Sequence, residues 1–370
     1  MDYKATEPAN DQRQQELPRA HRIAVVGAGQ VGSTFAYALL TSGLVGELVL
    51  IDVNRSRAEG EAMDLSHAVP LSNPMRIWAG DYADCAGADV TVISAGTAQR
   101  PGEARLELLK RNAKIFRDIV PHIVEHNRTG ILLIATNPVD ILSYVAWKES
   151  GLPAARVIGS GTVLDTARFR YLLGQHLGVD SRNVHAHIIG EHGDSEVPVW
   201  SMANITGIGL ESYCRNHGCD LGPEAREDIF ARTRDAAYEI IERKGATYYA
   251  VAMGLLRIVE SILRNQHTVL SISNLVPDYY EVEEVYLSLP AVVGRAGGGE
   301  DPQPAPGQHR GRCPSSLGRG SARGPGPDRE RRVSSTALVA TIVLCPAEPA
   351  HRAADLDPLW PLAGREGPGG

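Results

Sequence analysis

The chain has 370 residues, of which 43% are hydrophobic, and this length suffices for about two domains with cores of their own. Its formal net charge is -7 and no basic stripe interleaves with aromatic residues, so the composition argues against a nucleic-acid-binding protein. Five cysteines, an odd number with no CxxC pair, fit a reducing compartment, and we expect neither a structural disulfide nor a metal site.

The N-terminal segment MDYKATEPANDQRQQELPRA is polar and lacks the apolar core of a signal peptide. We therefore expect a disordered extension over residues 1–21. We also expect a cytoplasmic protein without a membrane partner.

The first buried-strand pattern, RIAVVG, starts at Arg22 and leads directly into a segment with helical spacing. Gly27, Gly29 and Gly32 form a GxGxxG at this junction, which suits a tight turn, close approach of a pyrophosphate and close helix–strand packing. The next strand ends in Asp52, 20 positions after the third glycine, where an acid can bind two ribose hydroxyls. This combination predicts an NAD site, because the acid would repel the additional phosphate of NADP. The open alternative is a glycine-rich turn in an ordinary βαβ unit.

Four more apolar runs follow at βαβ spacing, near Ile77, Val92, Leu133 and Val157. The alternation with helical stretches predicts an α/β fold with a parallel, doubly wound sheet. Ligands of such sheets bind at the carboxyl ends of the strands. The candidate site segments are therefore 96–105, 137–140 and 162–168.

Polar side chains in these segments allow two interpretations each. Arg105 ends a polar, Pro- and Gly-containing loop, so it is either a flap residue that polarises a carbonyl on closure or a solvated arginine. Asp165 and Arg168 share one helix face, as an intrahelical ion pair or as partners of a histidine and an anionic substrate. Helix capping explains Asn137 and Asp140 nearly as well as a functional role.

His192 lies in the motif IIGEHGDSE, residues 188–196. Two β-branched residues precede it and predict a buried strand, and Gly190 and Gly193 leave room for a small ligand to approach. His192 is thus a candidate proton donor and acceptor, although most histidines are ordinary surface or core residues.

Several long motifs occur together in order: GAGQVGS, AQRPGEAR, TNPVD, GSGTVLDTARFR, IIGEHGDSE, KGATYYA and YLSLPAVVGR. In these motifs the chain resembles the bacterial L-lactate dehydrogenases of the lactate and malate dehydrogenase superfamily, from about Arg22 to about Gly297. The resemblance implies a homotetramer that uses NAD in glycolysis and fermentation. It also implies a Rossmann NAD-binding domain over 22–162 and a mixed α+β catalytic domain over 163–297.

The resemblance further implies roles for matching residues. His192 would be the general acid and base and Asp165 its partner, Arg168 would anchor the substrate carboxylate, and Arg105 would polarise the carbonyl. Gln99, Asn137 and Thr247 would complete the substrate pocket, although Thr247 by itself suggests only capping or packing. The residues expected to line the cofactor are Gly27, Gly29, Val31, Gly32, Asp52, Tyr82, Gly96, Thr97 and Asn137.

The implied activity is the reversible conversion of (S)-lactate and pyruvate. Gln99 favours pyruvate over oxaloacetate, because family members that act on malate carry arginine at the matching position. Two alternatives stay open: a malate or other 2-hydroxy-acid dehydrogenase, and an NAD-binding protein of this fold that has lost catalysis.

Arg170 and His185 match the spacing of an effector site for fructose 1,6-bisphosphate in the bacterial enzymes that respond to this sugar. The resemblance therefore implies allosteric activation. The open alternative makes Arg170 a solvated helix residue and His185 a strand-entry residue.

The C-terminal segment departs from the family pattern. Of the 35 residues from Ala296 to Glu330, 15 are Gly or Pro, so we expect an aberrant, disordered tail over 298–370 instead of an amphipathic helix. A frameshift in a GC-rich gene and a natural disordered tail both account for it. We expect the change to affect domain packing, tetramer assembly and closure over the substrate.

Overall fold

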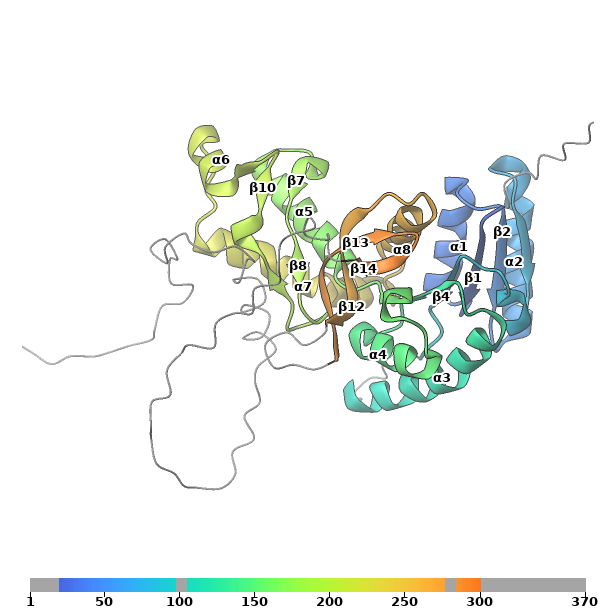
Figure 1. Cartoon of the computed structure of the whole chain (residues 1–370). Helices are drawn as coiled ribbons and strands as arrows, with labels where there is room; N and C mark the ends of the chain where they lie inside the picture. The colour runs from blue at the N-terminus through green and yellow to red at the C-terminus, as the bar shows by residue number, and fades with distance from the viewer. Residues whose placement is uncertain (1–19, 98–104, 277–283, 301–370) are drawn as a thin grey trace, which may run out of the picture.

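The computed structural model describes residues 20–97, 105–276 and 284–300 (Figure 1). Gln99 and most of the expected flap lie outside these residues. So do nearly all of the N-terminal extension and the segment from 301 to 370.

Six strands alternate with helices in the first half of the chain, where the apolar runs predicted them. In chain order the elements are β1 (Arg22–Val26), α1 (Gln30–Ser42), β2 (Glu47–Ile51), α2 (Arg55–Ala68), β3 (Arg76–Ala79), β4 (Val90–Ile93), α3 (Arg105–His126), β5 (Ile131–Ile134), α4 (Val139–Ser150) and β6 (Val157–Gly159). A short 3-10 helix, Tyr82–Cys85, lies between β3 and β4.

The second half mixes longer helices with short strands. Its elements are α5 (Val163–Leu177), β7 (Val184–His185), β8 (Ile188–Ile189), β9 (Val197–Pro198), β10 (Asn204–Ile205), β11 (Ile208–Gly209), α6 (Leu210–His217), α7 (Pro223–Lys244), α8 (Tyr249–Leu263), β12 (Thr268–Val276), β13 (Val285–Gly294) and β14 (Gly297–Glu300). Within the described residues, no helix is both long and apolar enough to cross a membrane.

The main sheet has nine strands in the order β14-β13-β12-β6-β5-β4-β1-β2-β3. Within this sheet the six strands β1 to β6 pair in parallel, in the order β6-β5-β4-β1-β2-β3. This is the strand order of a dinucleotide-binding fold and confirms the expected doubly wound sheet. Strand β12 joins β6 in antiparallel fashion at Ser273 and Gly159, and β13 and β14 continue the sheet. The second half of the chain therefore contributes three strands to the sheet of the first half. The small β7, β10 and β11 sheet, beside α6, lies at the other end of the molecule from β2 (Figure 1).

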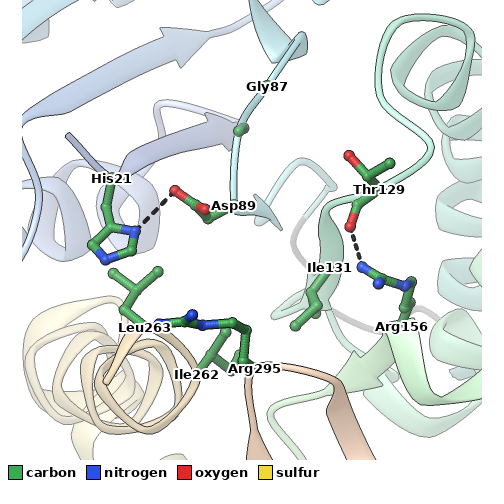
Figure 2. Close-up of a pocket in the computed structure, with 10 residues that line it drawn as sticks. His21, Gly87, Asp89, Thr129, Ile131, Arg156, Ile262, Leu263 and Arg295 are labelled. Carbon is green, nitrogen blue, oxygen red and sulfur yellow. Dashed lines mark hydrogen bonds and ion pairs between the residues drawn. The ribbon is translucent and has the colours of Figure 1, made fainter. Parts of the chain in front are cut away.

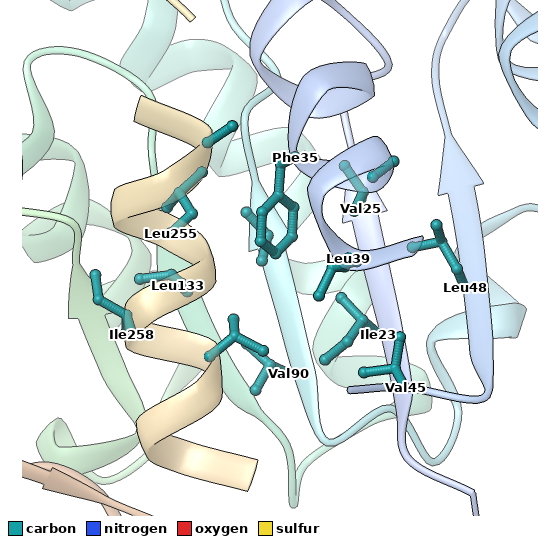
Figure 3. Close-up of a cluster of buried hydrophobic side chains, with 14 of the residues drawn as sticks. Ile23, Val25, Phe35, Leu39, Val45, Leu48, Val90, Leu133, Leu255 and Ile258 are labelled. Carbon is teal, nitrogen blue, oxygen red and sulfur yellow. The ribbon is translucent and has the colours of Figure 1, made fainter. Parts of the chain in front are cut away.

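Helices from both halves of the chain cover one face of the main sheet. Phe35 and Leu39 of α1 and Leu255 of α8 are fully buried in one core cluster with the strand residues beneath them (Figure 3). Helices α3 and α4 form a second cluster on strand residues of the sheet. Burial of each large apolar side chain contributes about 1.5–3 kcal/mol. Because α8 belongs to the second half of the chain yet packs on the sheet of the first half, this shared core couples the two halves.

The ordered sheet continues beyond the expected domain boundary at Gly297. Gly298 pairs with Val293, and β14 ends only at Glu300. Gly297 has a φ of 111°, and a Cβ there would lie 1.7 Å from the carbonyl oxygen of Ala155. A glycine at 297 thus lets β14 pack against the turn before β6, which is why a Gly-rich run forms a strand here.

The expectation of no disulfide is wrong. Cys214 and Cys219 form a disulfide, with their Cα atoms 4.6 Å apart. Helix α6 ends at His217, and its C-cap residue Gly218, with a φ of 70°, turns the chain back, so the two cysteines meet across the helix end. An odd cysteine count excludes complete pairing but not a single local pair; Cys85 is buried and free.

Candidate active site

The glycine loop after β1 combines one open and two crowded positions. Gly27 has a φ of 105°, and its N–H donates to the carbonyl of Ile51 at 2.7 Å. A Cβ at Gly32 would lie 1.9 Å from the carbonyl oxygen of Gly27, whereas a Cβ at Gly29 would meet nothing within 4 Å. Gly27 and Gly32 therefore shape the turn and the helix–strand contact. Gly29 leaves the space that a pyrophosphate needs at the start of α1.

Asp52 lies at the end of β2, directly beside this loop. One carboxylate oxygen accepts the backbone N–H of Ala28 at 2.7 Å, and the other accepts that of Asn54 at 2.8 Å. An acid held there fits the ribose hydroxyls of an adenosine whose phosphates lie at Gly29. The residues present thus fit NAD.

Tyr82 is half-buried and stacks on His122, with ring centroids 5.4 Å apart. Burial, followed by the charge of Asp118 and smaller contributions that include Asp52, raises the pKa of its hydroxyl. Tyr82 follows β3 and Asp52 follows β2, so both lie just after the carboxyl ends of neighbouring strands. Val31 is half-buried in the core cluster beneath α1.

Asn112 of α3 connects two of the expected site segments. Its Oδ1 accepts the backbone N–H of Thr97 at 2.9 Å, and its Nδ2 donates to the carbonyl of Asn137 at 2.9 Å. Gly96 lies beside Thr97, and a Cβ there would approach Thr136 to 2.4 Å. The loops after β4 and β5 are thereby held together. Asn112 was missed in the sequence, where its only signal is a polar residue on the apolar stripe of a helix.

The catalytic candidates meet where α5 passes the loop after β8. Nδ1 of His192 lies 2.6 Å from one carboxylate oxygen of Asp165, and the other oxygen accepts from Arg168 at 2.9 Å. The side chain of Asp165 is only 3% exposed, against 23% for His192 and 13% for Arg168. The intrahelical ion pair between Asp165 and Arg168 is therefore present, and Asp165 also pairs with the histidine. Binding of an anionic substrate by Arg168 stays a prediction.

Asp140 supports the histidine from a second direction. Its carboxylate accepts the backbone N–H of His192 at 2.8 Å and the hydroxyl of Ser288 at 3.4 Å. Helix α4 has Pro138 at its N-cap and no side-chain cap, so the capping interpretation of Asn137 and Asp140 is wrong. Asp140 is instead buried, and the N–H group that its carboxylate binds belongs to a residue 52 positions further along the chain.

The electrostatics of this cluster favour a protonated histidine. Burial by itself disfavours the imidazolium, but the charge and hydrogen bond of Asp165, with Asp140 and Glu196, raise the pKa of His192 to about 9. Burial pushes the pKa of Asp165 upward, and His192 and Arg168 outweigh it and hold that pKa below its usual range. This pKa favours the imidazolium near neutral pH, and within the described residues no hydrogen bond engages the other ring nitrogen.

The structure gives fewer contacts for Arg105 and Thr247, two further residues expected in the site. Arg105 opens α3, next to the segment that lies outside the described residues. Thr247 is half-buried in the loop between α7 and α8, and within the described chain no hydrogen bond joins it to His192. The structure brings together His192, Asp165 and Arg168.

A pocket of about 230 Å³ lies at the opposite end of the sheet (Figure 2). Its walls include His21, Asp89, Ile131 and Arg156, which precede or begin β1, β4, β5 and β6. Ligands of doubly wound sheets bind at the carboxyl ends of the strands, and this pocket is at the amino ends. We therefore do not associate this pocket with the cluster of His192, Asp165 and Arg168.

Two family models match the chain almost end to end over its folded part. Residues 21–159 match the lactate/malate dehydrogenase NAD binding domain, and residues 162–302 match the lactate/malate dehydrogenase alpha/beta C-terminal domain. The chain belongs to the lactate/malate dehydrogenase family. Its first half is accordingly the NAD-binding domain of this family, in agreement with the glycine loop and Asp52.

Several members of the family have high sequence similarity to this chain. An L-lactate dehydrogenase of Priestia megaterium is 53% identical over 283 residues, which cover 76% of this chain and 89% of that protein. An L-lactate dehydrogenase of Acetivibrio thermocellus is 55% identical over 274 residues, covering 74% and 86%. Among solved structures, MGS-M5, a lactate dehydrogenase enzyme from a Medee basin deep-sea metagenome library, is 50% identical with a TM-score of 0.73, covering 76% of this chain and 90% of that one.

Proposed function

We propose that the chain is an NAD-dependent L-lactate dehydrogenase that interconverts (S)-lactate and pyruvate with His192 as general acid and base. The observation that carries the proposal is the 2.6 Å contact between His192 and the buried Asp165. It orients the ring and stabilises the imidazolium, which a proton donor to a carbonyl oxygen requires. The similarity to bacterial L-lactate dehydrogenases supports the choice of substrate.

The residues divide the work of pyruvate reduction. When bound, NADH supplies the hydride. His192 donates its proton to the oxygen that becomes the lactate hydroxyl, and Asp165 stabilises the charged ring before the transfer. Arg168 uses one nitrogen for Asp165, and the rest of its planar fork suits a substrate carboxylate. In lactate oxidation the neutral imidazole accepts the proton.

The test is oxidation of NADH by the purified full-length chain with pyruvate and, separately, with oxaloacetate. We expect a higher kcat/KM with pyruvate. Gln99, which lies outside the described residues, carries this part of the proposal: a neutral amide leaves the second carboxylate of oxaloacetate unpaired in a closed site, at a cost of several kcal/mol. A higher kcat/KM with oxaloacetate would instead identify a malate dehydrogenase. Gln99→Arg should move the preference in that direction.

We also propose that fructose 1,6-bisphosphate activates a homotetrameric form of the enzyme through Arg170 and His185. Arg170 is partly buried and donates to the carbonyl of Ala186 at 2.8 Å, unlike a solvated helix residue. Burial, then the charges of Arg170 and His185, lower the pKa of the neighbouring His187 to about 4. The positive charge of Arg170 close to His187 supports a phosphate site.

Titration with the bisphosphate should lower the KM for pyruvate and shift the sedimentation coefficient towards the tetramer. Replacing Arg170 and His185 together by glutamine should abolish both responses. An effect that survives the double replacement would contradict this site. The cytoplasmic location stays a prediction.

A further inference from the structure

Glu196 is a buried acid beside the catalytic pair that the roles above do not use. It is only 5% exposed, and its Oε1 is buried without a hydrogen-bond partner among the described residues. One oxygen of Glu196, one oxygen of Asp165 and one ring nitrogen of His192 lie within 4.8 Å of one another. An ionised carboxylate is costly in such surroundings unless a cation is close. The imidazolium of His192 and the guanidinium of Arg168 are the cations that act on it.

The charges around Glu196 come from several elements. Helix α5 contributes Asp165 and Arg168, and α4 contributes Asp140, which holds the backbone of His192. In the same loop Glu191 accepts from Ser195, and Asp194 accepts from Tyr238 of α7. Glu191 and Asp194, the other two acids of this loop, therefore each accept a hydrogen bond, unlike Oε1 of Glu196.

These neighbouring charges determine how the pKa values of Glu196 and His192 shift. Burial, then the charge of Asp165, raise the pKa of Glu196 to about 8, although His192 and Arg168 act against the shift. In return, the charge of Glu196 is among the causes that raise the pKa of His192. Each group therefore changes the protonation of the other.

We propose that Glu196 is a positioning residue whose buried carboxyl group keeps its proton at neutral pH and releases it to solvent at alkaline pH, so that its charge then retains the proton on His192. The proposal rests on the proposed function, because a retained proton extends pyruvate reduction to higher pH. At neutral pH the uncharged acid leaves the positive charges of His192 and Arg168 available to an anionic substrate.

The kinetic test compares kcat/KM for pyruvate from pH 6 to pH 10 in the full-length wild type, Glu196→Gln and Glu191→Gln. Glu196→Gln preserves size but cannot ionise. Its alkaline limb should move down by about half a pH unit, so that at pH 10 it loses about threefold more of its pH 6.5 value than wild type. Glu191→Gln, in the same loop, should leave the limb in place. An unmoved limb in Glu196→Gln would overturn the proposal.

A second readout does not depend on turnover. Because the pKa of Glu196 in the folded chain, about 8, exceeds its usual 4.5, the folded state binds the additional proton and loses stability as pH rises between these values. The difference in Tm between Glu196→Gln and wild type should therefore increase in favour of the variant from pH 5 to pH 8. A difference that is constant with pH indicates packing alone and rejects the proposal. Failure of the wild type to reduce pyruvate would count against the proposed function only, since the Tm series still decides on Glu196.

A second variant covers the case in which Glu196→Gln does not fold. Glu196→Asp keeps the acid but withdraws it from His192 by one methylene. Its alkaline limb should shift in the same direction by a smaller amount. A limb that coincides with wild type would again reject the proposal.

Discussion

The cofactor end and the catalytic cluster are built in different ways. At the cofactor end, Gly27, Gly29 and Gly32 lie in one turn, and Asp52 reaches that turn from the neighbouring strand β2. The catalytic cluster instead combines α4, α5, β13 and the loop after β8, which come from well-separated parts of the chain. The first relies on backbone geometry and open space, and the second on buried charges that balance one another. Substitutions should therefore damage the two regions in different measurable ways.

The largest effect should follow removal of the histidine. His192→Gln removes the proton donor, and because general acid catalysis contributes about 10²–10⁴-fold, kcat should fall by about 10³-fold. NADH binding, followed by fluorescence titration, should stay near wild type, since the glycine loop is untouched. His217→Gln, which changes an exposed histidine at the end of α6, is the matched control. Retention of more than a tenth of kcat would contradict the role of His192.

The next effect should come from the partner acid. In Asp165→Asn the charge that opposes burial is lost, so the pKa of His192 should fall well below about 9. We expect kcat/KM for pyruvate at pH 7 to fall about 10²-fold, with a smaller loss at lower pH, because reduction needs the protonated ring.

Asp165 should also make the folded state less stable as pH rises, through its effect on the pKa of His192. In wild type the raised pKa of His192 stabilises the fold below its usual 6.5, and this contribution is lost as pH rises through about 9. Tm measured against pH should show that decline, and Asp165→Asn should flatten it. Asp180→Asn, whose partner Arg182 is on the surface, serves as control and should not alter the profile.

The glycine loop should respond to added bulk according to the space at each position. Gly32→Ala brings a methyl group to within 1.9 Å of a carbonyl oxygen, and we expect about 2 kcal/mol of destabilisation in denaturant unfolding. Gly29→Ala meets nothing within 4 Å and should unfold like wild type, yet bind NADH more weakly. Equal stability losses in both variants would show that the loop is not organised as described.

The smallest effect should be a change in cofactor preference. Asp52→Asn keeps an acceptor for the N–H of Ala28 but removes the negative charge beside the ribose. The preference for NADH over NADPH, as a ratio of kcat/KM values, should shrink about tenfold, equivalent to about 1.4 kcal/mol. An unchanged ratio would mean that Asp52 does not set the preference.

The local features of the chain were sufficient to predict most of the first half. Apolar runs at βαβ spacing predicted β1 to β6, and the GxGxxG with Asp52 predicted the turn beside an acid, because these patterns express backbone sterics within a few residues. The face shared by Asp165 and Arg168 also follows from helical periodicity. The strand before His192 was predicted correctly from its two β-branched residues.

Only the tertiary structure decided which partner each polar side chain takes. Asp140 could have capped a helix but binds the backbone of His192, Asn112 holds two loops together, and Glu196 is buried against Asp165. The extension of the parallel sheet by β12, β13 and β14 was likewise not visible in the sequence pattern. The physical reason is common to all of these. A local pattern determines which face of a helix or strand is apolar, whereas the partner of a buried charge or a sheet edge depends on packing between segments far apart in the chain.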